Sequence, residues 1–143
     1  MADRYERLKL ERQLCFPLYA ASKEVVRHYK PFLDELDMTY TQYIAMMVLW
    51  EHKELTVKDL GKYLYLDSGT LTPLLKTMEK KGWIIRCRSS VDERVLIVTL
   101  TENGELLRDK ALLVQKKMSG CVNLEKEDAE QLYKILYKIL ENL

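Results

Sequence analysis

The sequence lacks any long apolar run. None of its 143 residues belongs to a stretch near the roughly 20 apolar residues that a membrane-spanning helix needs. The first dozen residues are dense in charge and lack the apolar centre of a signal peptide. We therefore expect one cytoplasmic protein of single-domain length.

Cysteine and histidine are also scarce, with three of the first and two of the second. The cysteines lack the paired short spacing of a zinc site and are too few for a disulfide framework, so reduced thiols are expected. His28 and His52 are isolated in the sequence, and we interpret them as ordinary polar residues. The sequence thus predicts neither a metal nor a cofactor.

A strong net charge is absent too, because the formal value is only +1. Dedicated DNA-binding modules are often strongly basic, so this value alone is weak evidence for nucleic acid as a partner. From Lys53 to Leu100, however, nine lysines and arginines stand against six acids. That local excess suits DNA, because phosphate contacts need cations only on the docking face.

Two helices joined by a tight turn are predicted within the same stretch. Thr56 and Asp59 have the spacing of a capping box, so a short helix should begin there. Asp67 indicates the start of a second helix, and Gly82 indicates its end. Its apolar residues share one face at helical spacing: Leu71, Leu74, Leu75 and Met78. This is a helix-turn-helix plan.

A hairpin follows the second helix directly. The segments 83–88 and 94–100 are rich in β-branched and aromatic residues, and a polar link, 89–93, separates them. A helix pair followed by a hairpin with arginine near its tip is a winged helix, which places the helix in the major groove and the hairpin near the minor groove. The alternative is a helical domain with an incidental hairpin.

The chain resembles the MarR family of transcription regulators at this hairpin. The resemblance lies in Asp92, Glu93 and Arg94 and in the run from Leu100 to Gly104. It implies a mainly α (α+β) winged helix-turn-helix protein with N- and C-terminal dimerisation helices. We accordingly expect a single domain over 1–143, in which 38–101 form the DNA-binding lobe and 9–37 and 102–143 the dimerisation helices.

Four further helices are predicted around this lobe. The first continues to about Leu36, with a kink or break near Lys30 caused by Pro31. The others span about 41–52, 102–118 and 125–142. The last carries a broad apolar stripe: Ala129, Leu132, Leu136, Ile139 and Leu143. The stripe suggests a two-fold homodimer, although it could instead pack on the winged helix of the same chain.

Cys15 lies at a chemically suggestive position. Pro17 belongs in a first helical turn, so Cys15 should lie at or just before a helix N-terminus. Such a position favours the thiolate, which is the form that attacks peroxides. From position alone, the alternative that Cys15 is a small buried hydrophobe remains open.

Two stretches resemble a narrower branch of the family, the organic hydroperoxide resistance regulators. They are residues 13–16 and 18–20 around Cys15, with Pro17 outside the match, and the unbroken run 64–75. The resemblance implies that Cys15 senses hydroperoxides and that Tyr29 and Tyr40 of a partner subunit hydrogen-bond it; Tyr19, one helical turn after Cys15, is grouped with them.

Cys121 is a departure from a one-cysteine sensor. It lies in a predicted break between the last two helices, 119–123. Some members of this branch use a second C-terminal cysteine, which captures the oxidised first cysteine as a disulfide between subunits. The alternative is a thiol that never approaches Cys15. Cys87, in the first strand of the hairpin, is interpreted as a packing residue or a bystander.

The expected function is a redox-controlled regulator, with repression as its expected action. The reduced homodimer binds a pseudo-palindromic operator in double-stranded DNA, and an organic hydroperoxide releases it through Cys15 and Cys121. The residues expected at the DNA are Ser68, Thr70, Thr72, Lys76, Arg86, Arg88, Asp92 and Arg94, among which Asp92 orients an arginine. Two alternatives are a MarR-type regulator controlled by a small ligand and a thiol peroxidase.

Overall fold

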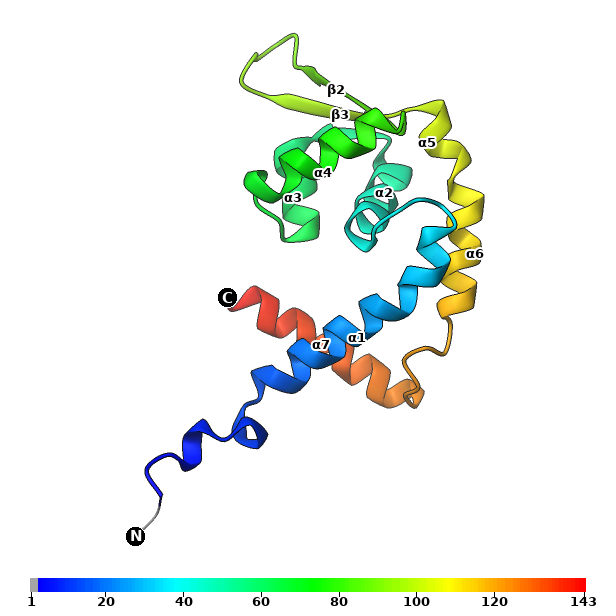
Figure 1. Ribbon diagram of the computed structural model, residues 1–143. Coiled ribbons are helices and arrows are strands. Elements are labelled where there is room, and N and C mark those ends of the chain that lie inside the picture. Colours follow the sequence, from blue (N-terminus) through cyan, green and yellow to red (C-terminus); the bar gives the residue numbers. More distant parts are fainter. Residues whose placement is uncertain (1–2) are drawn as a thin grey trace. The chain divides into compact units, whose positions relative to one another are not determined.

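The computed structural model describes residues 3–143, which form two compact units. Unit 2 comprises Val26–Lys117, and unit 1 comprises the residues up to Val25 together with Met118–Leu143. Figure 1 labels the elements. Among the described residues, no helix is long and apolar enough to cross a membrane.

Unit 2 holds a three-stranded antiparallel sheet and most of the helices. The strands are β1 (Glu54–Thr56), β2 (Ile84–Arg88) and β3 (Leu96–Leu100), and β3 lies between the other two. The helices are α2 (Tyr40–His52), α3 (Val57–Leu64), α4 (Ser68–Lys80), α5 (Glu102–Leu106), most of α6 (Arg108–Met118) and the C-terminal part of α1 (Cys15–Asp34).

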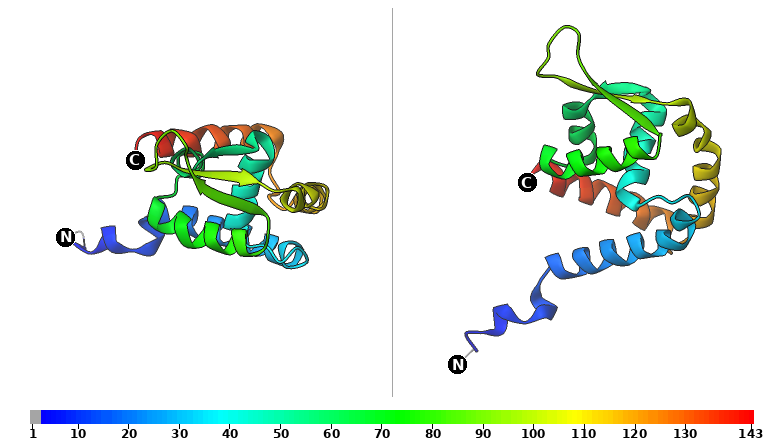
Figure 2. Two further views of the ribbon diagram at one scale, coloured as in Figure 1. Left: turned by 90° about the horizontal axis from the view of Figure 1, so that it is seen from above. Right: turned by 45° about the horizontal axis from the view of Figure 1, so that its top comes forward.

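The predicted mainly α (α+β) winged helix-turn-helix is confirmed. Helices α3 and α4 form the pair, and α4 is the recognition helix by its place in that pair. The wing consists of β2, β3 and the link between them, with Ile84 opposite Leu100 and Arg88 opposite Leu96. The right-hand view of Figure 2 shows this link projecting beyond the helices of unit 2.

Strand β1 was not predicted from the sequence. Its three residues are too few to show an alternating pattern, and they become a strand only by pairing with β3, where Leu55 lies opposite Val98. The capping box predicted at Thr56 is half confirmed. Thr56 Oγ1 accepts the N–H of Asp59 at 3.1 Å, but the Asp59 carboxylate lies 4.0 Å from Lys62 Nζ. A reciprocal box forms at the start of α2 instead, between Thr39 and Gln42.

The core of unit 2 follows the helical stripes. The largest fully buried side chains are Tyr43, Leu33, Met46, Leu49, Leu60, Leu71, Leu75, Met78, Ile84 and Val98. Trp50 Nε1 donates a buried hydrogen bond of 2.9 Å to the carbonyl of Gly104. A side chain at Gly104 would not fit, because a Cβ there would lie 2.3 Å from the carbonyl oxygen of Trp83. Helix α5 is thereby fixed against α2 and the start of β2.

Helix α1 differs from its prediction. Of the two predicted possibilities, a kink or a break near Lys30, the break is wrong, because the helix continues through Pro31 to Asp34. Proline removes one backbone donor inside a helix, and here the remaining turn stays helical because Leu33 is buried in the core of unit 2. The helix ends two residues before the predicted Leu36, whose N–H bonds the carbonyl of Leu33 at 3.0 Å in a tighter turn.

The remaining helices lie close to their predicted bounds, with one division. The single helix predicted over 102–118 is two helices, α5 and α6, separated at Leu107. Unit 1 contains the short 3-10 turns η1 (Glu6–Leu8) and η2 (Leu10–Arg12), the N-terminal part of α1, and α7 (Lys126–Glu141). No residue of α7 is buried within this chain.

Candidate functional site

The recognition helix begins at a well-formed cap. Asp67 Oδ1 accepts the N–H of Thr70 at 2.8 Å, and this backbone hydrogen bond, with one from the Thr70 side chain, lowers the pKa of Asp67 below its usual value. A carboxylate at this end also suits the helix dipole. The first turn of α4 is therefore fixed in place before any ligand binds.

The outer face of α4 is polar and accessible. Leu71, Leu75 and Met78 are buried on its inner face. The predicted DNA contacts on this helix are all exposed: Ser68, Thr70, Thr72 and Lys76. Thr72 Oγ1 donates to the carbonyl of Ser68 at 2.8 Å, which restrains its rotamer and leaves its lone pairs able to accept a hydrogen bond. Such a row of hydroxyls followed by a cation can contact base edges and phosphates.

The wing carries an arginine held by its own neighbour. The Asp92 carboxylate accepts hydrogen bonds from Arg94 Nε at 3.1 Å and from the Arg94 backbone N–H at 3.0 Å. The side-chain bond and then the backbone bond lower the pKa of Asp92. Ser89 Oγ orders the same link by accepting the N–H of Val91 at 3.1 Å. The Arg94 side chain remains 91% exposed, so it is oriented and still accessible.

Arg86 lies in the predicted wing strand, but its side chain is paired within the protein. Its side chain is only 17% exposed, and Nη2 lies 3.2 Å from Glu79 Oε1 on the recognition helix. We therefore assign Arg86 to the joint between α4 and the wing and remove it from the expected DNA contacts. Sequence reasoning also missed Glu79, because seven residues and a turn separate the pair. Arg88 is exposed, and its Nη1 lies 3.5 Å from the carbonyl of Glu93.

Cys15 is the first residue of α1 and is exposed. Pro17 lies in the first turn, as predicted, where its missing N–H has no intrahelical partner to lose. Tyr19 follows Cys15 by four residues on the same helix and is 62% exposed, so the two side chains share one face. Within this chain Cys15 is exposed and is not packed as a small buried hydrophobe.

Three tyrosines cluster in unit 2 at the C-terminal part of α1 and the start of α2. The ring centroid of Tyr29 lies 5.0 Å from that of Tyr40 and 5.6 Å from that of Tyr43. Burial raises the pKa of Tyr40. Burial, and then the proximity of Tyr29 and Tyr40, raises the pKa of Tyr43 to about 12. Tyr40 and Tyr43 therefore keep their protons at neutral pH and can act as donors.

The other two cysteines occupy different surroundings. Cys121 is half-buried in the link between α6 and α7, where its N–H bonds the carbonyl of Met118 at 3.0 Å. The neighbouring Gly120 has φ +84°, a conformation that glycine adopts without strain. Cys87 is exposed in β2, opposite Ile97. Cys15 and Cys121 both belong to unit 1, and Cys87 belongs to unit 2.

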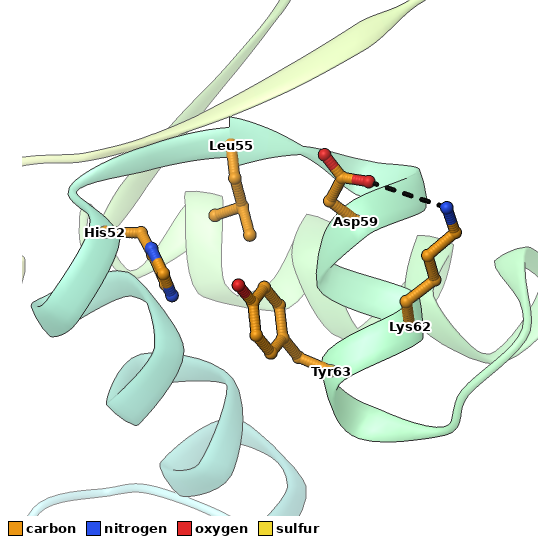
Figure 3. A pocket seen from close by; sticks show the side chains of 5 residues that line it. All are labelled: His52, Leu55, Asp59, Lys62 and Tyr63. Atoms are coloured by element: carbon orange, nitrogen blue, oxygen red, sulfur yellow. Dashed lines mark ion pairs between the residues drawn. The ribbon is translucent and has the colours of Figure 1, made fainter.

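A surface pocket of about 520 Å³ lies apart from all these residues, and none of the predicted site residues lines it. Its lining consists of His52, Leu55, Asp59, Lys62 and Tyr63. Figure 3 shows the His52 and Tyr63 rings facing each other, with centroids 5.0 Å apart. Across residues 3–143 no three potential metal-ligating side chains gather in one place.

The sequence is similar to those of known transcription regulators. The profile of the family described as transcriptional regulator SarA/Rot matches residues 27–111. The organic hydroperoxide resistance transcriptional regulator of Bacillus subtilis (strain 168) is 51% identical over 143 residues, which cover 100% of this chain and 97% of that protein.

Two solved structures of one protein, AbfR of Staphylococcus epidermidis, are also similar. Reduced AbfR bound to DNA is 34% identical with a TM-score of 0.80, and the match covers 98% of each chain. Disulfide-formed AbfR is 36% identical with a TM-score of 0.66, and the match covers 94% of this chain and 96% of AbfR.

Proposed function

This chain belongs to the MarR family of transcription regulators, in the branch of the organic hydroperoxide resistance regulators, and we propose that it is a DNA-binding repressor released by oxidation of Cys15. The observation that carries this proposal is the exposed thiol of Cys15 at the start of α1, in a chain that also presents a polar recognition helix. Transcription regulators are not enzymes, so the thiol peroxidase alternative is set aside.

The proposed DNA contacts divide between the recognition helix and the wing. Ser68, Thr70 and Thr72 meet base edges or phosphates at the start of α4, and Lys76 meets a phosphate one turn later. Arg94 enters the minor groove from the wing in the orientation that Asp92 gives it, and Arg88 supports it from β2. AbfR is known bound to DNA both in its reduced form and in an overoxidized form, which supports DNA binding by the reduced state here and favours the disulfide, rather than overoxidation of one cysteine, as the form that is released.

A homodimer accounts for the apolar surface that this chain leaves exposed. Along α7, large apolar side chains remain accessible, including Leu132, Tyr133, Ile135 and Tyr137, and Phe16 and Leu18 on α1 do so too. Such surface in unit 1 is more than a monomer needs. We propose that segments 9–37 and 102–143 dimerise, so that two copies of the lobe 38–101 meet half-sites about one DNA turn apart.

The partner subunit also completes the sensor. Cys15 and Tyr29 lie on one helix, fourteen residues apart, which is about 21 Å at a rise of 1.5 Å per residue. This separation supports the proposal that the Tyr29 that bonds a given Cys15 comes from the other chain, together with the adjacent Tyr40. A phenol that donates to the sulfur stabilises the thiolate and thus the reactive form.

The proposed oxidation proceeds in two balanced steps. The Cys15 thiolate attacks one oxygen of the hydroperoxide, so that an S–O bond forms, the O–O bond breaks and an alcohol leaves after taking up a proton. The Cys121 thiolate then attacks the sulfenic sulfur, so that an S–S bond forms, the S–O bond breaks, and hydroxide leaves and becomes water on taking up a proton. AbfR is known in a disulfide-formed state, which supports a second cysteine as the partner of Cys15.

The experiment combines intact mass with DNA binding. The probe is a duplex selected from a random-sequence pool by the reduced wild-type protein. Treatment with about one equivalent of cumene hydroperoxide should give a covalent dimer, and peptide mapping should identify a Cys15–Cys121 disulfide. DNA binding should weaken at least tenfold, which corresponds to about 1.4 kcal/mol.

Three variants separate the roles of the cysteines. Cys15→Ser should stay on DNA in the presence of the oxidant, and Cys87→Ser should behave as wild type. Cys121→Ser should stop at the sulfenic acid or a higher oxide of Cys15. Release of Cys15→Ser by hydroperoxide would overturn the sensor role and leave a regulator controlled by a small ligand.

A further inference from the structure

Lys81, the residue that follows the recognition helix, is held by three groups at once. Its ammonium donates to the backbone carbonyl of Asp37, lies 3.4 Å from the Asp37 carboxylate, and sits 4.7 Å above the ring of Trp83. Only 24% of its side chain is exposed. Partial burial of an ammonium is unfavourable unless it is paired, and here a carbonyl, a carboxylate and an aromatic face all compensate it.

The Asp37 side of this contact is rigid. Asp37 lies three residues after the end of α1, in the connection to α2, and has φ +52°. The N–H of Met38 bonds the carbonyl of Leu33 at 3.1 Å, and both of these side chains are buried in unit 2. A carbonyl held in this way is a fixed point, because the residues on either side of it are anchored.

The Trp83 side is rigid as well. Trp83 is buried, and its N–H bonds the carbonyl of Met78 at 3.1 Å. Its carbonyl accepts the N–H of Thr101 at 3.0 Å, immediately before α5. Lys81 therefore lies between two anchored groups, one after α1 and one at the start of the wing, and all of them belong to unit 2.

We propose that Lys81 is a positioning residue that joins the C-terminal end of α4 to the connection after α1 and so sets the orientation of the recognition helix. The DNA part of this inference rests on the proposed function. The DNA contacts proposed on α4 begin at Ser68, at the far end of a helix of 13 residues, about 20 Å long. A small rotation about the Lys81 end would displace them from the bases.

The first test needs no DNA. Amide hydrogen exchange is measured on the reduced protein for wild type, Lys81→Met and Lys80→Met. Methionine keeps an apolar stem over Trp83 but lacks the charge and the donors, and Lys80 is an exposed lysine of the same turn. Exchange should become about tenfold faster in 36–38 and 77–83 for Lys81→Met alone. Equal exchange in both variants would overturn the proposal.

The second test measures DNA affinity of the reduced proteins. Lys81→Met should bind the selected duplex about tenfold more weakly than Lys80→Met, and Lys81→Arg, which keeps charge and donors, should restore binding to within about threefold of wild type. Equal affinities of the two methionine variants would show that the contact does not orient α4 for DNA.

Salt dependence separates positioning from direct contact. If Lys81 itself met a phosphate, the slope of log affinity against log salt would fall by about 0.9 in Lys81→Met, and that result would also overturn the proposal. If the wild type selects no duplex, the proposed function fails, and the exchange measurement still decides whether Lys81 fixes the end of α4.

Discussion

Glu79 of the recognition helix holds Arg86 of the wing by two hydrogen bonds. Its Oε2 accepts the backbone N–H of Arg86 at 2.8 Å, and its Oε1 accepts Nη2 at 3.2 Å. The two bonds lower the pKa of Glu79, the backbone bond more than the side-chain bond. The pair fixes the first strand of the wing to α4, so the two elements proposed to read DNA keep one mutual orientation.

Replacing Glu79 tests this joint. Glu79→Ala should lower the free energy of unfolding by about 1–2 kcal/mol, because it leaves a mostly buried guanidinium without its partner. It should also weaken DNA binding, although removing a negative charge alone would strengthen it. Denaturant unfolding and DNA titration measure the two effects. Glu93→Ala is the control, and tighter binding by Glu79→Ala than by Glu93→Ala would contradict the role.

The Glu79 carboxylate should make the free energy of unfolding depend on pH, and its lowered pKa determines the direction. Since the folded-state pKa of Glu79 lies below its ordinary value of 4.5, its contribution to stability is present above that value and is lost as the pH falls through the lowered pKa. The difference in unfolding free energy between wild type and Glu79→Gln should be constant near neutral pH and shrink in acid. A difference that grows as the pH falls would be inconsistent with this linkage.

Replacing Gly69 should change stability and DNA affinity in opposite directions. It is exposed in the first turn of α4, and the nearest atom to a built Cβ is Asp67 Oδ1 at 3.4 Å. Gly69→Ala should therefore stabilise the fold by up to about 1 kcal/mol and weaken DNA binding, because its methyl group would lie between the proposed contacts Ser68 and Thr70. Gly61→Ala is the contrast, since a Cβ there lies 2.7 Å from the carbonyl of Leu66 and should destabilise the protein.

Substitutions of Asp92 and Arg94 in the wing separate the effect of charge on DNA affinity from the effect of side-chain orientation. Arg94→Ala should leave stability unchanged, because the side chain is 91% exposed, and should reduce affinity by about 1–3 kcal/mol. Asp92→Ala should also reduce affinity, since it frees Arg94 from its bound orientation, even though it removes a negative charge near DNA. Stronger binding by Asp92→Ala would show that Asp92 acts through its charge alone.

Tyr40 offers a test of the sensor across subunits. Tyr40→Phe should slow oxidation of Cys15 by about tenfold, the effect of losing one hydrogen bond of roughly 1.5 kcal/mol to a charged group. The rate is followed by mass after mixing with cumene hydroperoxide. Tyr65→Phe, at the end of α3, is the control. An unchanged rate in Tyr40→Phe would remove this residue from the sensor.

Local signals in the sequence were sufficient for the helix pair and the wing of the DNA-binding lobe. The cap at Asp67, the stripe of Leu71, Leu75 and Met78, and the β-branched segments of the wing each specify an element through residues close in sequence. The start of α1 at Cys15 was predictable for the same reason, from Pro17. The Asp92–Arg94 pair was within reach because the two residues are only two positions apart.

Tertiary packing decided the rest. Strand β1 exists only because β3 pairs with it, and α1 passes Pro31 because the last turn of the helix is anchored in the core of unit 2. Arg86 joins the wing to α4, and is not a DNA contact, because the fold brings Glu79 next to it. Lys81 contacts Asp37, which is 44 residues away in the sequence. The sequence determines where charges and caps occur along the chain. Only the folded structure determines which of those charged groups pair with one another within the protein.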